Sequence, residues 1–194
     1  GIKLGISNTV NASMGPASPA DFQLGQQVQR EELLNLDLQH DLEIGWQGPL
    51  SVAFGLQQHN ESFRIVAGEP ASYARGPLAL QGFSAGSNGF QGFSPDTAGV
   101  THRRSHGVYL DLEGNPTETL LVAAAVRGEK FSDFGQAFTA KGSGRFEFTP
   151  GWAVRGSLGT GFRAPTVGQT ALRRTSTSFA GGQLVENLVL PPTN

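Results

Sequence analysis

The sequence of 194 residues contains no cysteine and a single methionine. Without cysteine there can be no disulfide bond and no thiolate metal site. The sequence therefore does not indicate whether the protein is in an oxidising or a reducing compartment. No segment approaches the roughly 18 consecutive apolar residues that a membrane-spanning helix needs. The first ten residues, GIKLGISNTV, are not a charged segment followed by an apolar one, so no signal peptide is predicted in them. A membrane protein of this composition would have to be a β-barrel.

Charged residues are also scarce, at 15% of the chain, and the formal net charge is −2. This balance supplies no basic field for a nucleic acid, so no nucleic-acid partner is predicted. Glycine and phenylalanine are abundant instead, with 27 and 13 copies. Such a composition is typical of a turn-rich β protein.

The clearest pattern in the chain is an alternation with a period of two. Between Leu34 and Ile44 the even positions are apolar except for His40, and the odd positions are polar or acidic. Residues 138–148 repeat this alternation, which helical spacing would mix. The segment QVQREELL, residues 27–34, could form one short helical turn in a loop. We predict seven strands, over residues 2–12, 34–44, 50–58, 104–112, 120–130, 138–148 and 152–162.

The connections between these strands alternate between short and long. Short turns are expected at residues 46–49, 113–116 and 149–151, and long loops at 14–30, 68–101 and after Pro165; SDFGQ, residues 132–136, is a short connection at a long-loop position. If every connection is a hairpin, all short turns lie at one end of the sheet, as in bacterial outer-membrane barrels. Trp46, Phe148 and Trp152 lie beside the short turns, where an aromatic girdle would be.

Two all-β architectures fit the alternation. One is part of a transmembrane β-barrel with antiparallel up-and-down strands, and the other is a soluble β-sandwich that serves as a ligand-binding module. The barrel is favoured because strands of roughly 11 to 15 residues exceed the usual length in globular sheets and suffice for a tilted membrane strand. It is also favoured by the polarised loop lengths and by polar faces that carry both charge signs, as in Arg127 with Glu129 and Arg145 with Glu147.

Residues 107–166 contain R-x-E, SDFG and GFRAP in order and at hairpin spacing: Arg127 and Glu129, then residues 132–135, then Gly161, Phe162, Arg163, Ala164 and Pro165. This stretch resembles the barrel of TonB-dependent outer-membrane receptors. NASMGP (11–16), GPLSVAFG (48–55) and AGEPASYARG (67–76) resemble the same family.

The resemblance implies uptake of a scarce solute, of siderophore, cobalamin or carbohydrate type, across the outer membrane of a Gram-negative bacterium. It implies a transporter rather than an enzyme, with outer-membrane lipid, the protein's own plug domain, further barrel strands and periplasmic TonB as partners. Residues 1–194 are expected to be an internal part of the barrel, without the plug domain and the C-terminal strands. The sequence does not identify the solute.

Two sets of residues are candidates for contact with a solute or with the plug. The first set is the aromatic and basic side chains around the longest loop: Tyr73, Arg75, Phe83, Phe90, Phe93, His102 and Arg103. Packing within the loop is the alternative role of its aromatic residues. The second set comprises charged residues expected to face the barrel lumen: Arg127, Glu129, Lys141, Arg145, Glu147 and Arg155.

No catalytic residue, metal site or cofactor is predicted. Gly159-x-Gly161-x-x-Ala164 matches the dinucleotide fingerprint in form, but Pro165 biases Ala164 toward extended backbone where that fingerprint requires a helix. His102 and His106 would lie about 13 Å apart along a strand, too far to share a metal. Asp37, Asp41 and Glu43 share one strand face, where lining a polar lumen is their expected role.

Overall fold

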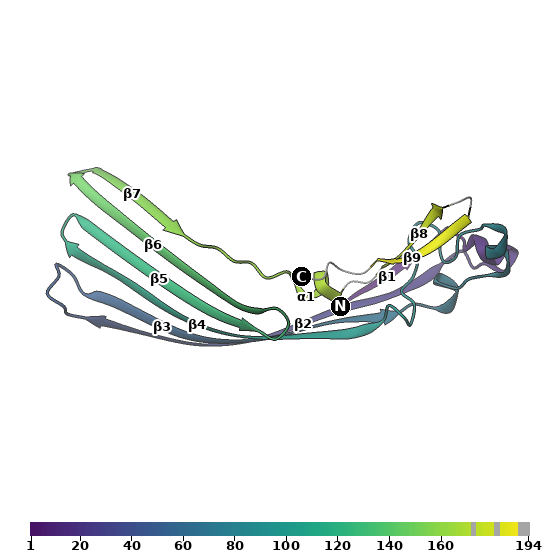
Figure 1. Ribbon diagram of the computed structural model, residues 1–194, viewed down its shortest axis with the longest axis horizontal. Coiled ribbons are helices and arrows are strands. Elements are labelled where there is room, and N and C mark those ends of the chain that lie inside the picture. Colours follow the sequence, from purple (N-terminus) through teal and green to yellow (C-terminus); the bar gives the residue numbers. More distant parts are fainter. Residues whose placement is uncertain (172–173, 181–182, 190–194) are drawn as a thin grey trace. The chain divides into compact units, whose positions relative to one another are not determined.

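A computed structural model describes residues 1–171, 174–180 and 183–189. Seven strands form one sheet in the order of the sequence, and this sheet is not closed into a barrel (Figure 1). The predicted all-β, antiparallel up-and-down fold is therefore confirmed. The strands are β1 (Ile2–Ile6), β2 (Phe22–Leu42), β3 (Leu50–Ala67), β4 (Gly99–Thr117), β5 (Leu120–Phe131), β6 (Gly135–Thr149) and β7 (Trp152–Gly159).

The remaining elements are short. Three 3-10 helices lie in the loops: η1 (Ala12–Ala17), η2 (Pro70–Ser72) and η3 (Pro77–Gln81). A five-residue α-helix, α1 (Val167–Ala171), follows β7, and β8 (Arg174–Ala180) pairs with β9 (Gln183–Val189) in a separate hairpin. No helix in the described part of the chain is long and apolar enough to cross a membrane.

The chain divides into two compact units. One contains residues 1–30, 61–102 and 165–194, and we call it the loop unit because it holds the two longest connections between strands of the sheet. Its core is formed by Phe63, Ile65, Phe93 and Val167, against which Leu4, Phe90 and Ala171 pack. The other unit contains residues 31–60 and 103–164, and we call it the strand unit.

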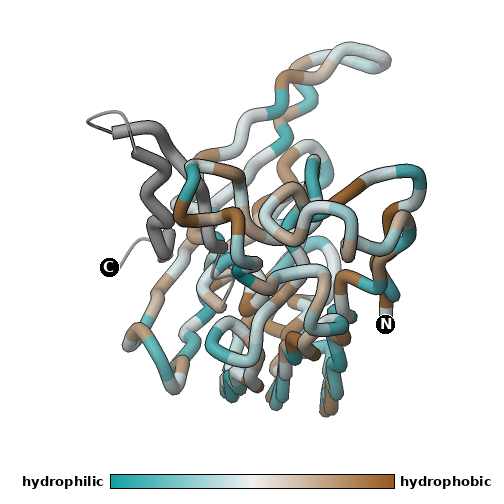
Figure 2. The backbone as a smooth tube through the Cα atoms, turned by 90° about the vertical axis from the view of Figure 1, so that its right-hand side faces the viewer, coloured by the Kyte–Doolittle hydropathy of each residue, from teal (hydrophilic) through white to brown (hydrophobic). Residues whose placement is uncertain are grey.

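The register of the strand unit separates even from odd positions. Even residues pair with even residues from β4 to β7, for example Leu110 with Val126 and Phe146 with Val154. Because side chains alternate across a strand, even residues share one face and odd residues the other, up to the register shifts between Gly114 and Thr117 and between Glu147 and Thr149. Figure 2 shows the resulting succession of hydrophobic and hydrophilic segments along the tube. We call the two sides the apolar face and the polar face.

The apolar face is uncovered in the structure. Leu34, Phe138 and Leu158 are 70%, 68% and 85% exposed. The β-sandwich alternative is not adopted, because a sandwich buries this face against a second sheet. An uncovered apolar face with polar residues opposite is the arrangement of a strand between lipid and water.

The turns are polarised as predicted, with adjusted boundaries. Strands β2 and β3 are joined by residues 43–49, β4 and β5 by 118–119, and β6 and β7 by 150–151, whereas residues 7–21 and 68–98 form the long connections. Residues 113–116 are not a turn: they lie in β4, where the register shifts between Gly114 and Thr117. Proline cannot donate to the ladder, so Pro116 is accommodated at this irregularity. The ring of Trp46 packs on Gly114 at this end of the sheet.

Several predicted boundaries in the first third of the chain are wrong. QVQREELL is not a helical turn but part of β2, which begins at Phe22 rather than Leu34. Strand β1 ends at Ile6 rather than at residue 12, and residues 12–17 form η1. The first half of β2 is a strand because β1 pairs with it, from Ile2 opposite Gln27 to Ile6 opposite Phe22. Tertiary pairing thus overrides a weak local pattern.

Candidate functional site

The polar face of the strand unit carries side chains that reach across whole strands. The Tyr109 hydroxyl, on β4, donates a hydrogen bond of 2.8 Å to Oδ1 of Asp37, on β2. Strand β3 lies between them, and at the crossing point it has Gly55. A Cβ at position 55 would overlap the Tyr109 ring. The glycine therefore makes the contact between β2 and β4 possible.

A second crossing of the same kind lies beside the first. Arg127, on β5, reaches Gln57 on β3, and it passes Gly107 of β4, whose Cβ would lie 3.3 Å from the guanidinium. The same guanidinium donates to Glu129 at 2.7 Å, and the Gln57 amide donates to Asn35 of β2 at 3.0 Å. The polar side chains thus form connected hydrogen-bonded groups rather than isolated charges.

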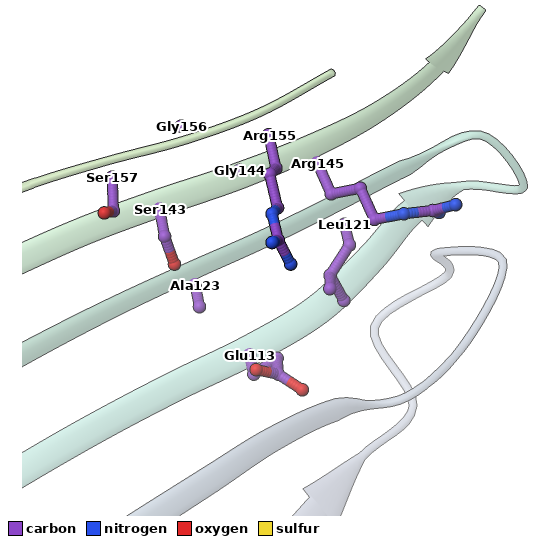
Figure 3. A pocket seen from close by; sticks show the side chains of 9 residues that line it. All are labelled: Glu113, Leu121, Ala123, Ser143, Gly144, Arg145, Arg155, Gly156 and Ser157. Atoms are coloured by element: carbon purple, nitrogen blue, oxygen red, sulfur yellow. The ribbon is translucent and has the colours of Figure 1, made fainter. Parts of the chain in front are cut away.

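All six predicted lumen residues lie on the polar face: Arg127, Glu129, Lys141, Arg145, Glu147 and Arg155. Arg145 and Glu147 are joined by a 2.8 Å ion pair, and Arg145 lies directly opposite Arg155 in the register. Arg145 and Arg155 border a cavity of about 430 Å³, which Figure 3 shows with its lining side chains. Lys141 borders a second cavity of similar size with Tyr109 and Arg127.

The two family-like motifs SDFG and GFRAP meet at the opposite end of the strands from the short turns. The Phe134 ring stacks on Phe131, with 4.3 Å between centroids, and lies 5.8 Å from Phe162. Arg103, which is 3% exposed, lies with its guanidinium carbon 5.0 Å from the Phe134 centroid and donates to Asp133 at 2.7 Å. Arg103 is thus held inside this cluster.

The other loop candidates differ in what they can contact. Arg75, Phe83 and His102 are exposed, and Tyr73 is half-buried beside η2. Phe90 packs edge to face on Phe93. Phe93 is 5% exposed and belongs to the core of the loop unit, so its ring is not on the surface.

Sequence reasoning missed a buried polar cluster that joins the two long connections of the loop unit. Asn11 is fully buried, and its amide nitrogen donates at 2.9 Å to the carbonyls of both Ala71 and Ala74. Its Oδ1 accepts from the Ser13 hydroxyl at 2.7 Å, and the same hydroxyl accepts from the backbone N–H of Gly76. These contacts join NASMGP to AGEPASYARG. A polar residue between apolar neighbours gives no sequence signal for a specific partner about 60 residues away.

No group of three or more His, Asp or Glu side chains that could hold a metal is found among the residues whose side chains are described. His102 and His106 both lie in β4, and both are exposed. Gly159 ends β7 and α1 begins only at Val167, so no helix begins inside the glycine pattern of residues 159–164.

A comparison with protein families matches residues 4–190 to the family described as TonB dependent receptor-like, beta-barrel. No curated protein and no solved structure matches the chain. The match covers nearly the whole chain, so the protein belongs to this family. It is a family of outer-membrane transporters and receptors of Gram-negative bacteria rather than of enzymes, and its full-length members have a plug domain and interact with TonB.

The hydrogen bond from Tyr109 to Asp37 across β3 allows a direct test of the role given to Gly55. Replacing Gly55 with valine is expected to displace Tyr109 and to break its hydrogen bond to Asp37. The expected loss is about 1–3 kcal/mol of unfolding free energy. Denaturant unfolding of the full-length receptor in detergent micelles measures it. Gly142→Val is the control, because a Cβ at position 142 meets no atom within 4 Å. Equal stability of the two variants would contradict the role given to Gly55.

Proposed function

We propose that residues 1–194 form part of the barrel wall of a receptor that takes up a scarce solute of siderophore, cobalamin or carbohydrate type with energy from TonB. In this proposal the apolar face contacts outer-membrane lipid, and the polar face contacts the plug domain and water. The plug domain and the strands that complete the barrel lie elsewhere in the full-length protein. The observation that carries the proposal is the separation of even and odd residues over four strands.

The open edges of the sheet support a larger barrel. Strands β1 and β7 each have one neighbour in the seven-stranded sheet. An edge strand in lipid would leave backbone N–H and C=O groups without partners, which costs several kcal/mol per group. Further strands of the same protein would satisfy these groups at both edges. This requirement agrees with a full-length receptor in which the present strands are one sector of the wall.

The exposed residues of the loop unit are the proposed point of first contact with the solute. Tyr73, Arg75 and Phe83 lie on the 68–98 connection, and His102 lies just after it. An aromatic ring and a guanidinium supply stacking and charge-assisted hydrogen bonds, the contacts that most often dominate binding. Phe93 is left out of this surface because it is buried.

Replacing Phe83 with serine is expected to weaken binding of the solute by about tenfold or more, as for a hot-spot aromatic side chain. The ring is 47% exposed, so the loop unit should keep its fold. Binding to the purified full-length receptor is measured with a ferric siderophore, cobalamin and an oligosaccharide in turn. Asn88→Ser, an exposed position on the same connection, is the control.

Energisation is tested separately in cells. Uptake of the ligand that binds is compared between a strain with TonB and one without it. We expect uptake to stop without TonB while binding at the cell surface persists. Uptake at an unchanged rate without TonB would contradict the proposed mechanism, and absence of binding for all three ligands would contradict the proposed solute classes.

A further inference from the structure

Arg155 is the exception among the arginines on the polar face of β4–β7. Arg103, Arg127 and Arg145 each lie 2.7–2.8 Å from a carboxylate, of Asp133, Glu129 and Glu147 respectively. Within the part of the chain that the structure describes, Arg155 has no such partner and no side-chain hydrogen bond. Arg155 is exposed on the edge strand β7, so a partner for its charge can approach from outside the described residues.

The strand register raises the electrostatic cost of leaving Arg155 without a carboxylate partner. Arg155 lies directly opposite Arg145 across β6 and β7. Like charges at directly opposed positions of a sheet destabilise it. Glu147 neutralises Arg145, and Figure 3 shows the Arg145 side chain extending away from that of Arg155. An anion beside Arg155 would complete the neutralisation of the pair.

A hollow is present where that anion would lie. Ala123, Ser143 and Ser157 form one register row across β5, β6 and β7, and the neighbouring row consists of Leu121, Arg145 and Arg155. The small side chains of the first row leave the cavity of about 430 Å³ beside the large side chains of the second. In Figure 3 the Arg155 guanidinium extends over β6 into this space. Glu113 is the one acidic residue among those described as lining the cavity.

We propose that Arg155, Ser143 and Ser157 form a binding site for an oxyanion, a carboxylate or a phosphate group. The guanidinium donates two parallel hydrogen bonds to such a group, and the serine hydroxyls donate to its remaining oxygen lone pairs. A cavity of this size holds a small ligand or one head of a larger one. Arg155 lies four residues after Gly151, the last residue of the short turn at 150–151, at the other end of the strands from the SDFG turn.

The oxyanion has two sources with the same chemistry. It is either the anionic group of a free solute or a side-chain carboxylate of the same protein outside the described residues. This assignment concerns a site separate from the loop unit. It therefore stands whether or not the loops capture the solute classes proposed above, and its test does not depend on uptake.

The test measures the thermal unfolding midpoint of the purified full-length receptor as a function of inorganic phosphate, with chloride adjusted to constant ionic strength. A ligand that binds the folded state raises the midpoint with its concentration. We expect such a rise in the wild type and an apparent phosphate affinity at least about tenfold weaker in Arg155→Gln. Arg155→Lys should retain part of the effect, because lysine keeps the charge without the bidentate fork.

Arg64→Gln is the matched control. It removes the same charge from an exposed arginine of β3 and should leave the phosphate dependence unchanged. If the wild type shows no phosphate dependence but Arg155→Gln lowers the midpoint relative to Arg64→Gln, the site exists and a carboxylate of the protein occupies it. If Arg155→Gln matches the wild type in both midpoint and phosphate dependence, the proposal is wrong.

Discussion

Asn11→Leu is expected to open the loop unit without unfolding the strand unit. The substitution removes one hydrogen bond each from the Ala71 carbonyl, the Ala74 carbonyl and the Ser13 hydroxyl, all made by the fully buried Asn11 side chain. The Ala74 carbonyl still accepts from the N–H of Gly86 and the Ser13 hydroxyl from that of Gly76, so each of the three lost hydrogen bonds is expected to cost about 1 kcal/mol, about 3 kcal/mol together. The local opening free energy of the 68–98 connection should fall by this amount.

Amide hydrogen exchange of the full-length receptor measures this opening. Protection should decrease at residues such as Ser72 and Gly76, which hydrogen-bond within the cluster, and it should persist in β5 and β6. Asn88→Leu is the matched control, because Asn88 lies on the same connection and is exposed. Equal exchange in the two variants would show that the Asn11 contacts do not hold the connections together.

Gly25→Val should have an even larger effect, because it strains the backbone and overlaps a neighbouring strand. Gly25 has a φ of +118°, which L side chains rarely adopt, and a Cβ there would overlap the carbonyl oxygen of Val66. The strained conformation costs about 1–3 kcal/mol and the overpacking about as much again. The residue lies beside a β-bulge: Leu4 pairs with Gly25 and Gly5 with Gln23, so Leu24 is the extra residue.

The amount of folded receptor in outer-membrane fractions is the first measurement for Gly25→Val, and the denaturant midpoint of the purified protein is the second. Both should fall well below those of Gly5→Val, a substitution in the partner strand where the nearest atom to a Cβ is 3.4 Å away. Valine suits a strand when there is room for it. If Gly25→Val accumulates as well as Gly5→Val, the close approach at this bulge does not limit folding.

The two-faced sheet could be predicted because alternation is a local property of the sequence. Leu36, Leu38 and Phe146 each stand between two polar residues, and their parity alone places them on one face. The placement of Arg127, Arg145 and Arg155 on the other face follows from the same parity. The prediction of a barrel rather than a sandwich followed from the loop lengths and from the motifs SDFG and GFRAP. The family match over residues 4–190 supports this prediction.

The contacts that distinguish individual residues could not be predicted in the same way. The contact between Asp37 and Tyr109 depends on which strands are neighbours and on the position of Gly55 between them. A lone glycine at an odd position of an alternating strand was the available signal. The β1–β2 pairing likewise depends on residues that carry little alternation, such as Gln26 and Gln27.

The burial of the candidate ligand-binding residues in the long loop could not be predicted from the sequence either. Phe93 and Phe83 stand in two copies of the tripeptide QGF, so the sequence gives both rings the same status. The structure separates them, because Phe93 packs with Phe63 and Ile65 of β3 whereas Phe83 is exposed. Burial of a loop residue depends on tertiary contacts that composition does not encode.

Because even and odd residues of β4–β7 lie on opposite faces of the sheet, insertions and deletions within these strands are restricted in length. One codon inserted between Arg145 and Phe146 would carry the part of β6 beyond it to the opposite side of the sheet, so that a charged carboxylate would meet the lipid. Two codons would restore the original sides, whereas a single extra residue has to be absorbed by a bulge such as the one beside Gly25. Length variation is therefore expected to occur in pairs within the strands and in any number within the loop unit.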